Sequence, residues 1–231
     1  ILLIFIAWFY LTFPMILTYD SAHYMGYVQI FENVLPFSTW DIVRGPVFPI
    51  LIHLSNLFFG KTSNGIVLFS FIFYLVMLFV SAKIIKEFSQ ENKKVKTVLT
   101  ILFFLLVVFN IIVFGYYHTL LTEFVAMTVS IVSCYLSWKL LLKTTKGDKK
   151  YYFLLMLYFV VMVPFSWFLK QPYVSITLFP LIISTIISLF TSKPIKKFLP
   201  HFAVLLLSVV SLFIGIFAWN KILEKKGVET D

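Results

Sequence analysis

Seven apolar segments, each long enough to cross a lipid bilayer, dominate this chain. About 20 apolar residues in a helix span the hydrocarbon, where every backbone polar group must find its partner within the protein. The sequence is 61% hydrophobic and 13% charged, which leaves too little polar surface to coat a soluble protein. We therefore expect an all-α, polytopic membrane protein with about seven transmembrane helices. The segments lie at residues 1 to 18, 65 to 85, 97 to 114, 124 to 142, 151 to 168, 174 to 191 and 198 to 219.

Residues 1 to 231 are predicted to form a single transmembrane domain. The first residue, Ile1, already lies inside an apolar segment, so we expect the chain to be part of a longer protein. Cys134 is the sole cysteine and also lies in an apolar segment. Disulfides and cysteine-based metal clusters are therefore excluded.

The distribution of lysine orients the segments. A further apolar run at residues 47 to 59 has only 13 residues and contains His53 and Asn56, so we predict that it is re-entrant or interfacial. If it does not cross, 13 of the 19 basic residues fall in loops on one side, which the positive-inside rule assigns to the cytoplasm. The N-terminus is then cytoplasmic and residues 19 to 64 face outward. If the run does cross, residues 20 to 46 are cytoplasmic instead.

The first outer loop, residues 19 to 64, is predicted to hold two interfacial helices. Tyr24, Tyr27, Val28 and Phe31 recur at helical spacing on one face, so this helix is expected to lie flat on the membrane. A second short helix is expected after Pro46, because proline suits a first helical turn. The net charge of +9 is accounted for by membrane topology and anionic lipid, and we expect no nucleic-acid partner.

Three charged residues are predicted at the outer ends of three different apolar segments: Asp20, Glu123 and Lys170. An enzyme that works at the membrane surface would gather its site there. Each residue also has a structural interpretation. Asp20 could be a helix N-cap, Glu123 could face the positive end of a helix dipole, and Lys170 could extend its ammonium to the interface.

Arg44 lies at a Gly-Pro corner between the two predicted interfacial helices. Its guanidinium could bind a phosphate through two parallel hydrogen bonds, or it could pair with Asp41 three residues earlier. The sequence does not distinguish these two roles.

Two histidines are predicted on the outer face near the carboxylates. His23 follows Asp20 by three residues, and His118 precedes Glu123 by five. Asp20, Glu123 and His23 are therefore candidate ligands for a divalent cation. The alternative is that the histidines are ordinary solvated side chains, and the sequence leaves metal dependence open.

The chain resembles the GT-C membrane glycosyltransferases, in particular the protein O-mannosyltransferases and the lipid A aminoarabinose transferases. The similarity lies in four segments: Asp20-Ser21-Ala22-His23-Tyr24 after the first span, Arg44-Gly45-Pro46 before an apolar run, Thr119-Leu120-Leu121-Thr122-Glu123, and Phe168-Leu169-Lys170-Gln171-Pro172-Tyr173. It covers the N-terminal half of such an enzyme. One departure concerns the acidic pair of the first motif, whose second member is Ser21 here.

The resemblance implies a GT-C-like fold and transfer of a sugar, with inversion, from a polyprenyl-phosphate donor to a glycan, lipid or protein acceptor. Asp20 would be the general base, Arg44 and Lys170 would bind the phosphate, and Glu123 would orient the acceptor or share a divalent cation with Asp20. Tyr24, His118 and Gln171, which lie in or beside these motifs, are assigned to substrate binding.

The expected location is the bacterial plasma membrane, with the active site on the outer face. The alternative is a non-catalytic membrane subunit, or a component of a flippase or polymerase for lipid-linked glycans. Such a protein needs a lipid groove but no base.

Overall fold

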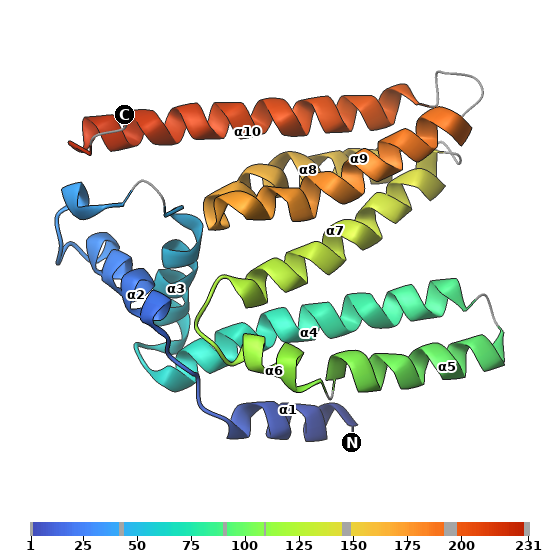
Figure 1. Ribbon diagram of the computed structural model, residues 1–231, viewed down its shortest axis with the longest axis horizontal. Coiled ribbons are helices and arrows are strands. Elements are labelled where there is room, and N and C mark those ends of the chain that lie inside the picture. The colour runs from blue at the N-terminus through green and yellow to red at the C-terminus, as the bar shows by residue number, and fades with distance from the viewer. Residues whose placement is uncertain are drawn as a thin grey trace. The chain divides into compact units, whose positions relative to one another are not determined.

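The chain is helical throughout the residues that the computed structural model describes (Figure 1). Residues 16 and 119 form an isolated parallel bridge, and no strand occurs in this part of the chain. The all-α expectation is therefore confirmed. The described residues are 2–41, 44–89, 92–108, 110–144, 149–191 and 198–228.

Five helices in the described residues are long and apolar enough to cross a membrane. They correspond to five of the seven expected segments: α4 (Ser63–Phe88), α7 (Glu123–Thr144), α8 (Lys149–Leu169), α9 (Val174–Thr191) and α10 (Leu199–Lys225). The first expected segment is helical over α1 (Leu2–Thr12), which has 11 residues. The count of about seven spans stays a prediction.

The segment expected at residues 97 to 114 is a broken helix. It consists of α5 (Lys93–Phe103), a π-helical turn (Phe104–Val108) and α6 (Ile111–Tyr117), with a bend of 51° before α6. Asn110 explains the restart, because its side-chain oxygen accepts hydrogen bonds from the N–H groups of Ile112 (2.9 Å) and Val113 (3.4 Å). Asparagine in this position is a strong N-cap. Residues 93–108 and α6 would together make a sixth span if they cross the membrane as one unit.

Helices are present at both positions where interfacial helices are expected, as α2 (Tyr19–Phe31) and α3 (Val47–Phe59). The apolar face of α2 does not lie open to the membrane: Tyr24 is buried and meets the ring of Phe48 on α3 edge to face at 4.8 Å. That face is protein core, because α3 supplies a second apolar surface against it. With 13 residues, α3 is about 20 Å long, less than the ~30 Å hydrocarbon.

The chain divides into two compact units. The first unit contains Ile1–Glu32 and Phe48–Ile131, and the second contains Asn33–Val47 and Val132–Asp231. The predicted outer loop is therefore shared, since α2 and nearly all of α3 belong to the first unit and the segment between them belongs to the second. Helix α7 starts in the first unit and ends in the second.

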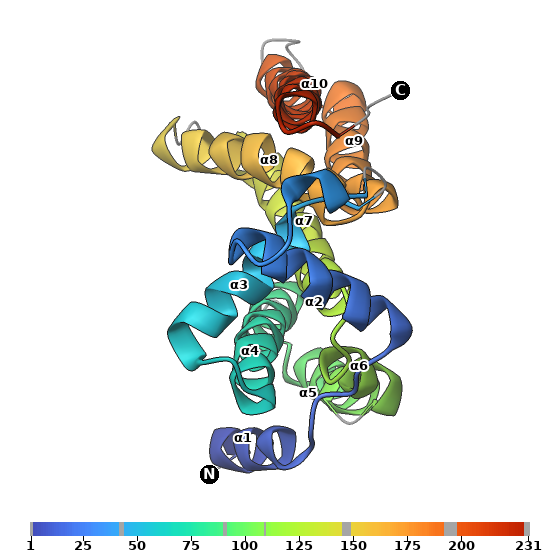
Figure 2. The ribbon, with the colours of Figure 1, turned by 90° about the vertical axis from the view of Figure 1, so that its left-hand side faces the viewer.

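The first unit is held together by a buried chain of hydroxyl groups. Tyr10 of α1 bonds Ser70 of α4 and donates to the carbonyl of Tyr117, each at 2.9 Å. The hydroxyl of Tyr117 contacts that of Thr128 on α7 at 2.6 Å, and Thr128 donates to the carbonyl of Phe73 at 3.1 Å. In a membrane, where lipid tails are as apolar as the side chains, such bonds help to fix helices to one another. They join α1, α4, α6 and α7; Figure 2 views α4 nearly end-on, with α1 beside it.

The second unit packs α8, α9 and α10 around Phe159, which is fully buried. Helices α8 and α10 approach closely where Gly215 faces Phe168: a Cβ added there would lie 3.0 Å from the Phe168 ring. Small residues permit such close helix contacts in membranes. Ser211 of α10 also donates to the carbonyl of Val160 on α8 at 2.7 Å.

Candidate functional site

Asp20 lies in the first turn of α2, but it is not the cap of that helix. The N-cap is Thr18, whose hydroxyl accepts from the N–H of Ser21 (3.4 Å), while the Ser21 hydroxyl accepts from the N–H of Thr18 (2.9 Å). This reciprocal capping box satisfies the helix start without Asp20. The N-cap interpretation of Asp20 is therefore wrong, and its half-buried carboxylate lies at the positive end of the helix dipole.

The start of α2 is tied to the loop that leads into α7. The buried hydroxyl of Ser21 donates to the carbonyl of Leu120 at 2.8 Å. Two residues before α2's cap, Ile16 exchanges backbone hydrogen bonds with this loop, and the N–H of Leu120 donates to the carbonyl of Ile16 at 3.0 Å. The segments that carry Asp20 and Glu123 are thus neighbours in the first unit.

Glu123 is the first residue of α7 and is half-buried. Its carboxylate accepts a long hydrogen bond of 3.4 Å from the hydroxyl of Thr122. A position at the start of a helix is the one expected if the carboxylate of Glu123 interacts with the positive end of the helix dipole. It is also a location from which a carboxylate can act on a ligand above the helix end.

His118 has a structural environment. It is buried, stacked on Phe114 at 4.0 Å, and its ring nitrogens lie 2.8 Å from the carbonyl oxygen of Tyr10 and 3.1 Å from that of Phe114. Both nitrogens face backbone rather than the surface. We therefore leave His118 out of the proposed substrate site.

His23 is exposed, and its ring meets that of Tyr19 edge to face at 4.8 Å. The described residues contain no group of three His, Cys, Asp or Glu side chains arranged to hold a metal ion. The cation proposed for Asp20, Glu123 and His23 therefore gains no support from their arrangement. Tyr24, expected in substrate binding, lies in the interface of α2 with α3 and supports the position of α2.

The second unit carries the two predicted phosphate ligands. Arg44 is half-buried, and its backbone is fixed on both sides: its N–H donates to the carbonyl of Asp41 (3.0 Å) and its carbonyl accepts from the Trp40 indole (2.9 Å). Trp40 is buried and packs edge to face on Trp219 of α10 at 5.5 Å. The Trp40 ring thereby anchors the segment between α2 and α3 to the second unit.

Gly45 brings this segment against the end of α8. A Cβ added to Gly45 would lie 1.8 Å from the carbonyl oxygen and 2.4 Å from the carbonyl carbon of Phe168, so only glycine permits this approach. Arg44 precedes Gly45, and Lys170 follows Phe168 by two residues. Two cations that are far apart in sequence therefore stand on backbone segments in direct contact.

Lys170 occupies the N-cap position of a short 3-10 turn, Gln171–Tyr173. It is half-buried, and its ammonium lies 5.7 Å from the centre of the Tyr173 ring. Gln171 is exposed at the same turn. Both side chains are thus at the end of α8, where the sequence predicts a ligand.

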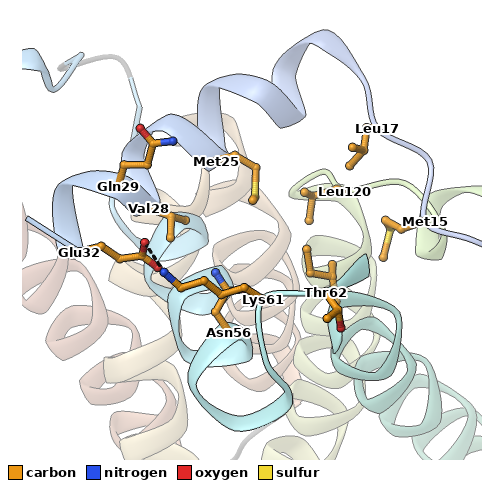
Figure 3. Close-up of a pocket in the computed structure, with 11 residues that line it drawn as sticks. Met15, Leu17, Met25, Val28, Gln29, Glu32, Asn56, Lys61, Thr62 and Leu120 are labelled. Atoms are coloured by element: carbon orange, nitrogen blue, oxygen red, sulfur yellow. Dashed lines mark hydrogen bonds and ion pairs between the residues drawn. The ribbon is translucent and has the colours of Figure 1, made fainter. Parts of the chain in front are cut away.

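A cavity of about 370 Å³ lies beside the carboxylate segments in the first unit (Figure 3). Leu17 and Leu120, each three residues from a predicted catalytic carboxylate, form part of its apolar wall. Its rim carries an ion pair between Lys61 and Glu32 at 2.7 Å, and His53 lies 3.9 Å from the same carboxylate. The sequence predicts that Glu32 and Lys61 lie in the outer loop. Their spacing does not predict the ion pair, because it depends on how α2 and α3 pack.

No protein-family model, curated protein or solved structure matches this chain. Any functional assignment therefore rests on the residues and their arrangement within each unit.

Proposed function

We propose that the protein transfers a sugar from a polyprenyl-phosphate donor to an acceptor hydroxyl on the outer face of the membrane. The observation that carries the proposal is the contact of Gly45 with Phe168, which brings the backbone beside Arg44 to the end of α8 that bears Lys170. A lipid phosphate is the ligand class that suits an arginine and a lysine near the end of an apolar helix. The carboxylate segments of the first unit would supply the base.

The chemistry requires a base and a means to neutralise the leaving group. Asp20 takes the proton of the acceptor hydroxyl while the hydroxyl oxygen attacks the anomeric carbon. The bond from that carbon to the phosphate oxygen breaks with inversion, and the polyprenyl phosphate departs with one more negative charge. Arg44 and Lys170 stabilise that charge as it develops. Glu123 orients the acceptor, or would hold a divalent cation together with Asp20.

The departure at Ser21 does not weaken this mechanism. Ser21 is buried and its hydroxyl donates to the carbonyl of Leu120. A carboxylate cannot donate that bond, so a second acidic residue at this position would break the link between α2 and the loop before α7. The reaction needs one base, and Asp20 is sufficient for it.

The test separates turnover from donor binding. Membranes that contain the protein are given polyprenyl-phosphate-mannose or polyprenyl-phosphate-aminoarabinose, and release of polyprenyl phosphate is measured. Asp20→Asn is expected to lower turnover by about 10² to 10⁴-fold, the usual contribution of a general base, and to leave polyprenyl-phosphate binding intact. Arg44→Gln and Lys170→Gln are each expected to weaken that binding by about tenfold or more, as for hydrogen bonds to charged groups.

Matched controls come from α10. Lys221 and Glu224 form an exposed ion pair at 2.6 Å in the second unit, and Lys221→Gln and Glu224→Gln make the same charge changes at positions outside the four sequence motifs. They are expected to leave turnover and binding unchanged. Full turnover by a folded Asp20→Asn protein would overturn the mechanism. Binding that depends on Arg44 and Lys170 without any transfer would favour the flippase alternative.

A further inference from the structure

A second cavity, of about 590 Å³, lies within the first unit between α4 and the broken helix α5. Its walls are apolar: Leu75, Leu78 and Phe79 come from α4, and Phe103, Phe104 and Val108 come from α5 and the π-helical turn. Leu75 and Phe79 are also partly exposed, so the cavity is a groove in the side of the bundle rather than a sealed void. In a membrane such a groove is open to lipid chains.

The groove has the length of one lipid leaflet. Along α4 it extends from Leu75 to Lys86, and eleven positions at about 1.5 Å per residue give about 16 Å. The hydrocarbon of a bilayer is about 30 Å thick, so half of it is about 15 Å. An acyl chain of one leaflet therefore matches the groove from end to end.

Two lysines mark one end of the groove. Lys86 on the last turns of α4 and Lys96 on the first turn of α5 both line it and are both exposed. No carboxylate belongs to the lining that the structure describes. Thr100, the remaining polar residue of the lining, donates its hydroxyl to the carbonyl of Lys96 at 2.7 Å. The cationic end of the groove thus depends on the two ammonium groups.

The wall opposite α4 departs from regular helix. Phe104–Val108 forms a π-helical turn. Such turns are rare in proteins, and those that occur are often found at functional sites. The hydroxyl of Tyr74 donates to the carbonyl of Val108 at 3.3 Å, which stabilises the turn from α4. The irregular turn therefore has a bonded, fixed shape, and two of its residues face the groove.

We propose that this groove binds one anionic phospholipid of the leaflet that faces the lysine-rich loops. The acyl chain lies between α4 and α5, and the phosphate lies between the ammonium groups of Lys86 and Lys96. Basic pockets at the cytoplasmic ends of transmembrane helices bind anionic head groups in this way. This site is separate from the one proposed for sugar transfer: it lies at the opposite end of α4 from Thr62 and Ile66, which line the 370 Å³ cavity beside the carboxylate segments.

The experiment titrates the full, delipidated protein in a non-ionic detergent with phosphatidylglycerol or phosphatidylcholine and follows bound lipid by native mass spectrometry. Phosphatidylglycerol is expected to bind more tightly. The double variant Lys86→Gln, Lys96→Gln is expected to bind it about 30-fold more weakly, which corresponds to about 1 kcal/mol for each lysine. Ala82→Trp, a change at an exposed position in the groove, is expected to weaken binding of both lipids by blocking the chain.

The matched control is Lys93→Gln, Lys94→Gln, which removes two exposed charges from the same first turn of α5 but outside the groove. It is expected to change the affinity by less than threefold. Equal losses in the two double variants would show general charge attraction and overturn the proposal, as would undiminished binding by Ala82→Trp. Competition by soluble glycerol 3-phosphate as strong as that by phosphatidylglycerol would also overturn it, because the site would then bind phosphate without a chain.

Discussion

At the level of single residues, Ser21 shows why a short acidic motif can change without loss of the site. Its hydroxyl donates to the carbonyl of Leu120 at 2.8 Å and accepts from the N–H of Thr18 at 2.9 Å. One side chain thus completes the cap of α2 and fixes that helix to the loop before α7. The residue next to the proposed base has a structural task that needs a donor and an acceptor together.

We expect Ser21→Ala to lower the free energy of unfolding by about 2 kcal/mol, because it leaves a buried carbonyl unpaired and removes a capping bond. For a chain of this length that is a decrease of about 4 to 8 °C in the midpoint of thermal unfolding. Ser21→Asp is expected to lose more, since it buries a carboxylate that cannot donate. The midpoint is measured in detergent by circular dichroism.

The control for Ser21 is Ser175→Ala. Ser175 is exposed and donates to the carbonyl of Pro172 at 2.7 Å, so the same atoms are removed where water can replace the bond. We expect a change within about 0.5 kcal/mol. A Ser21→Asp protein as stable as the wild type would contradict the structural role of Ser21.

At the level of elements, the segment between α2 and α3 can contact the end of α8 closely because Gly45 has no side chain. Gly45→Ala would place a Cβ 1.8 Å from the carbonyl oxygen of Phe168, so the two backbones must separate. We expect a loss of about 1 to 3 kcal/mol in the free energy of unfolding, the usual cost of overpacking. Polyprenyl-phosphate binding should weaken too, because Arg44 moves away from the end of α8; a lipid-binding titration beside the melting curve checks both.

Gly26 provides the opposite case for the same substitution. It lies within α2, and a Cβ there would meet nothing within 4 Å. Gly26→Ala is expected to raise the free energy of unfolding by about 0.5 to 1 kcal/mol, since alanine loses less backbone entropy in a helix. If both alanine variants were equally stable, the close contact of Gly45 would not govern the position of its segment.

The elements themselves were largely predictable from sequence, whereas their partners were not. Apolar length predicts α4 and α7 to α10, and helical spacing with Pro46 predicts α2 and α3, because these signals are local. The same spacing could not tell whether the apolar face of α2 meets lipid or protein, since that depends on Phe48 of α3. The break at Asn110 could be read only in hindsight as an N-cap within an apolar run.

For the candidate site too, the positions of single residues could be predicted from the sequence, but their neighbours in space could not. Asp20, Glu123 and Lys170 lie at helix ends, and Arg44 lies in the segment between α2 and α3. Their grouping into two pairs of neighbouring segments depends on long-range contacts that no spacing reveals. His118 shows the reverse error, because proximity in sequence to Glu123 suggests a surface ligand, while packing against Phe114 makes it part of the core.

At the level of the whole molecule, one contact bears on whether residues 47 to 59 cross the membrane. If residues 47 to 59 and α4 both crossed, and α5 and α6 together formed one further span, Asp20 and Glu123 would lie on opposite sides of the bilayer. The hydroxyl of Ser21 lies 2.8 Å from the carbonyl of Leu120, and a hydrogen bond cannot extend across ~30 Å of hydrocarbon. The contact therefore supports a re-entrant or interfacial α3, in agreement with its 13 residues.

Cysteine labelling tests this directly. In a Cys134→Ala background, Ser38→Cys and Asn64→Cys flank α3 at exposed positions, and Lys94→Cys is exposed beyond α4. If α3 does not cross, a membrane-impermeant thiol reagent on intact cells should label the first two. If the lysine-rich loops lie in the cytoplasm, the reagent should label the third only after permeabilisation. Opposite reactivity of Ser38→Cys and Asn64→Cys would mean that α3 crosses. That result would put Asp20 in the cytoplasm, away from an outer acceptor, and the proposed transfer reaction would fail with it.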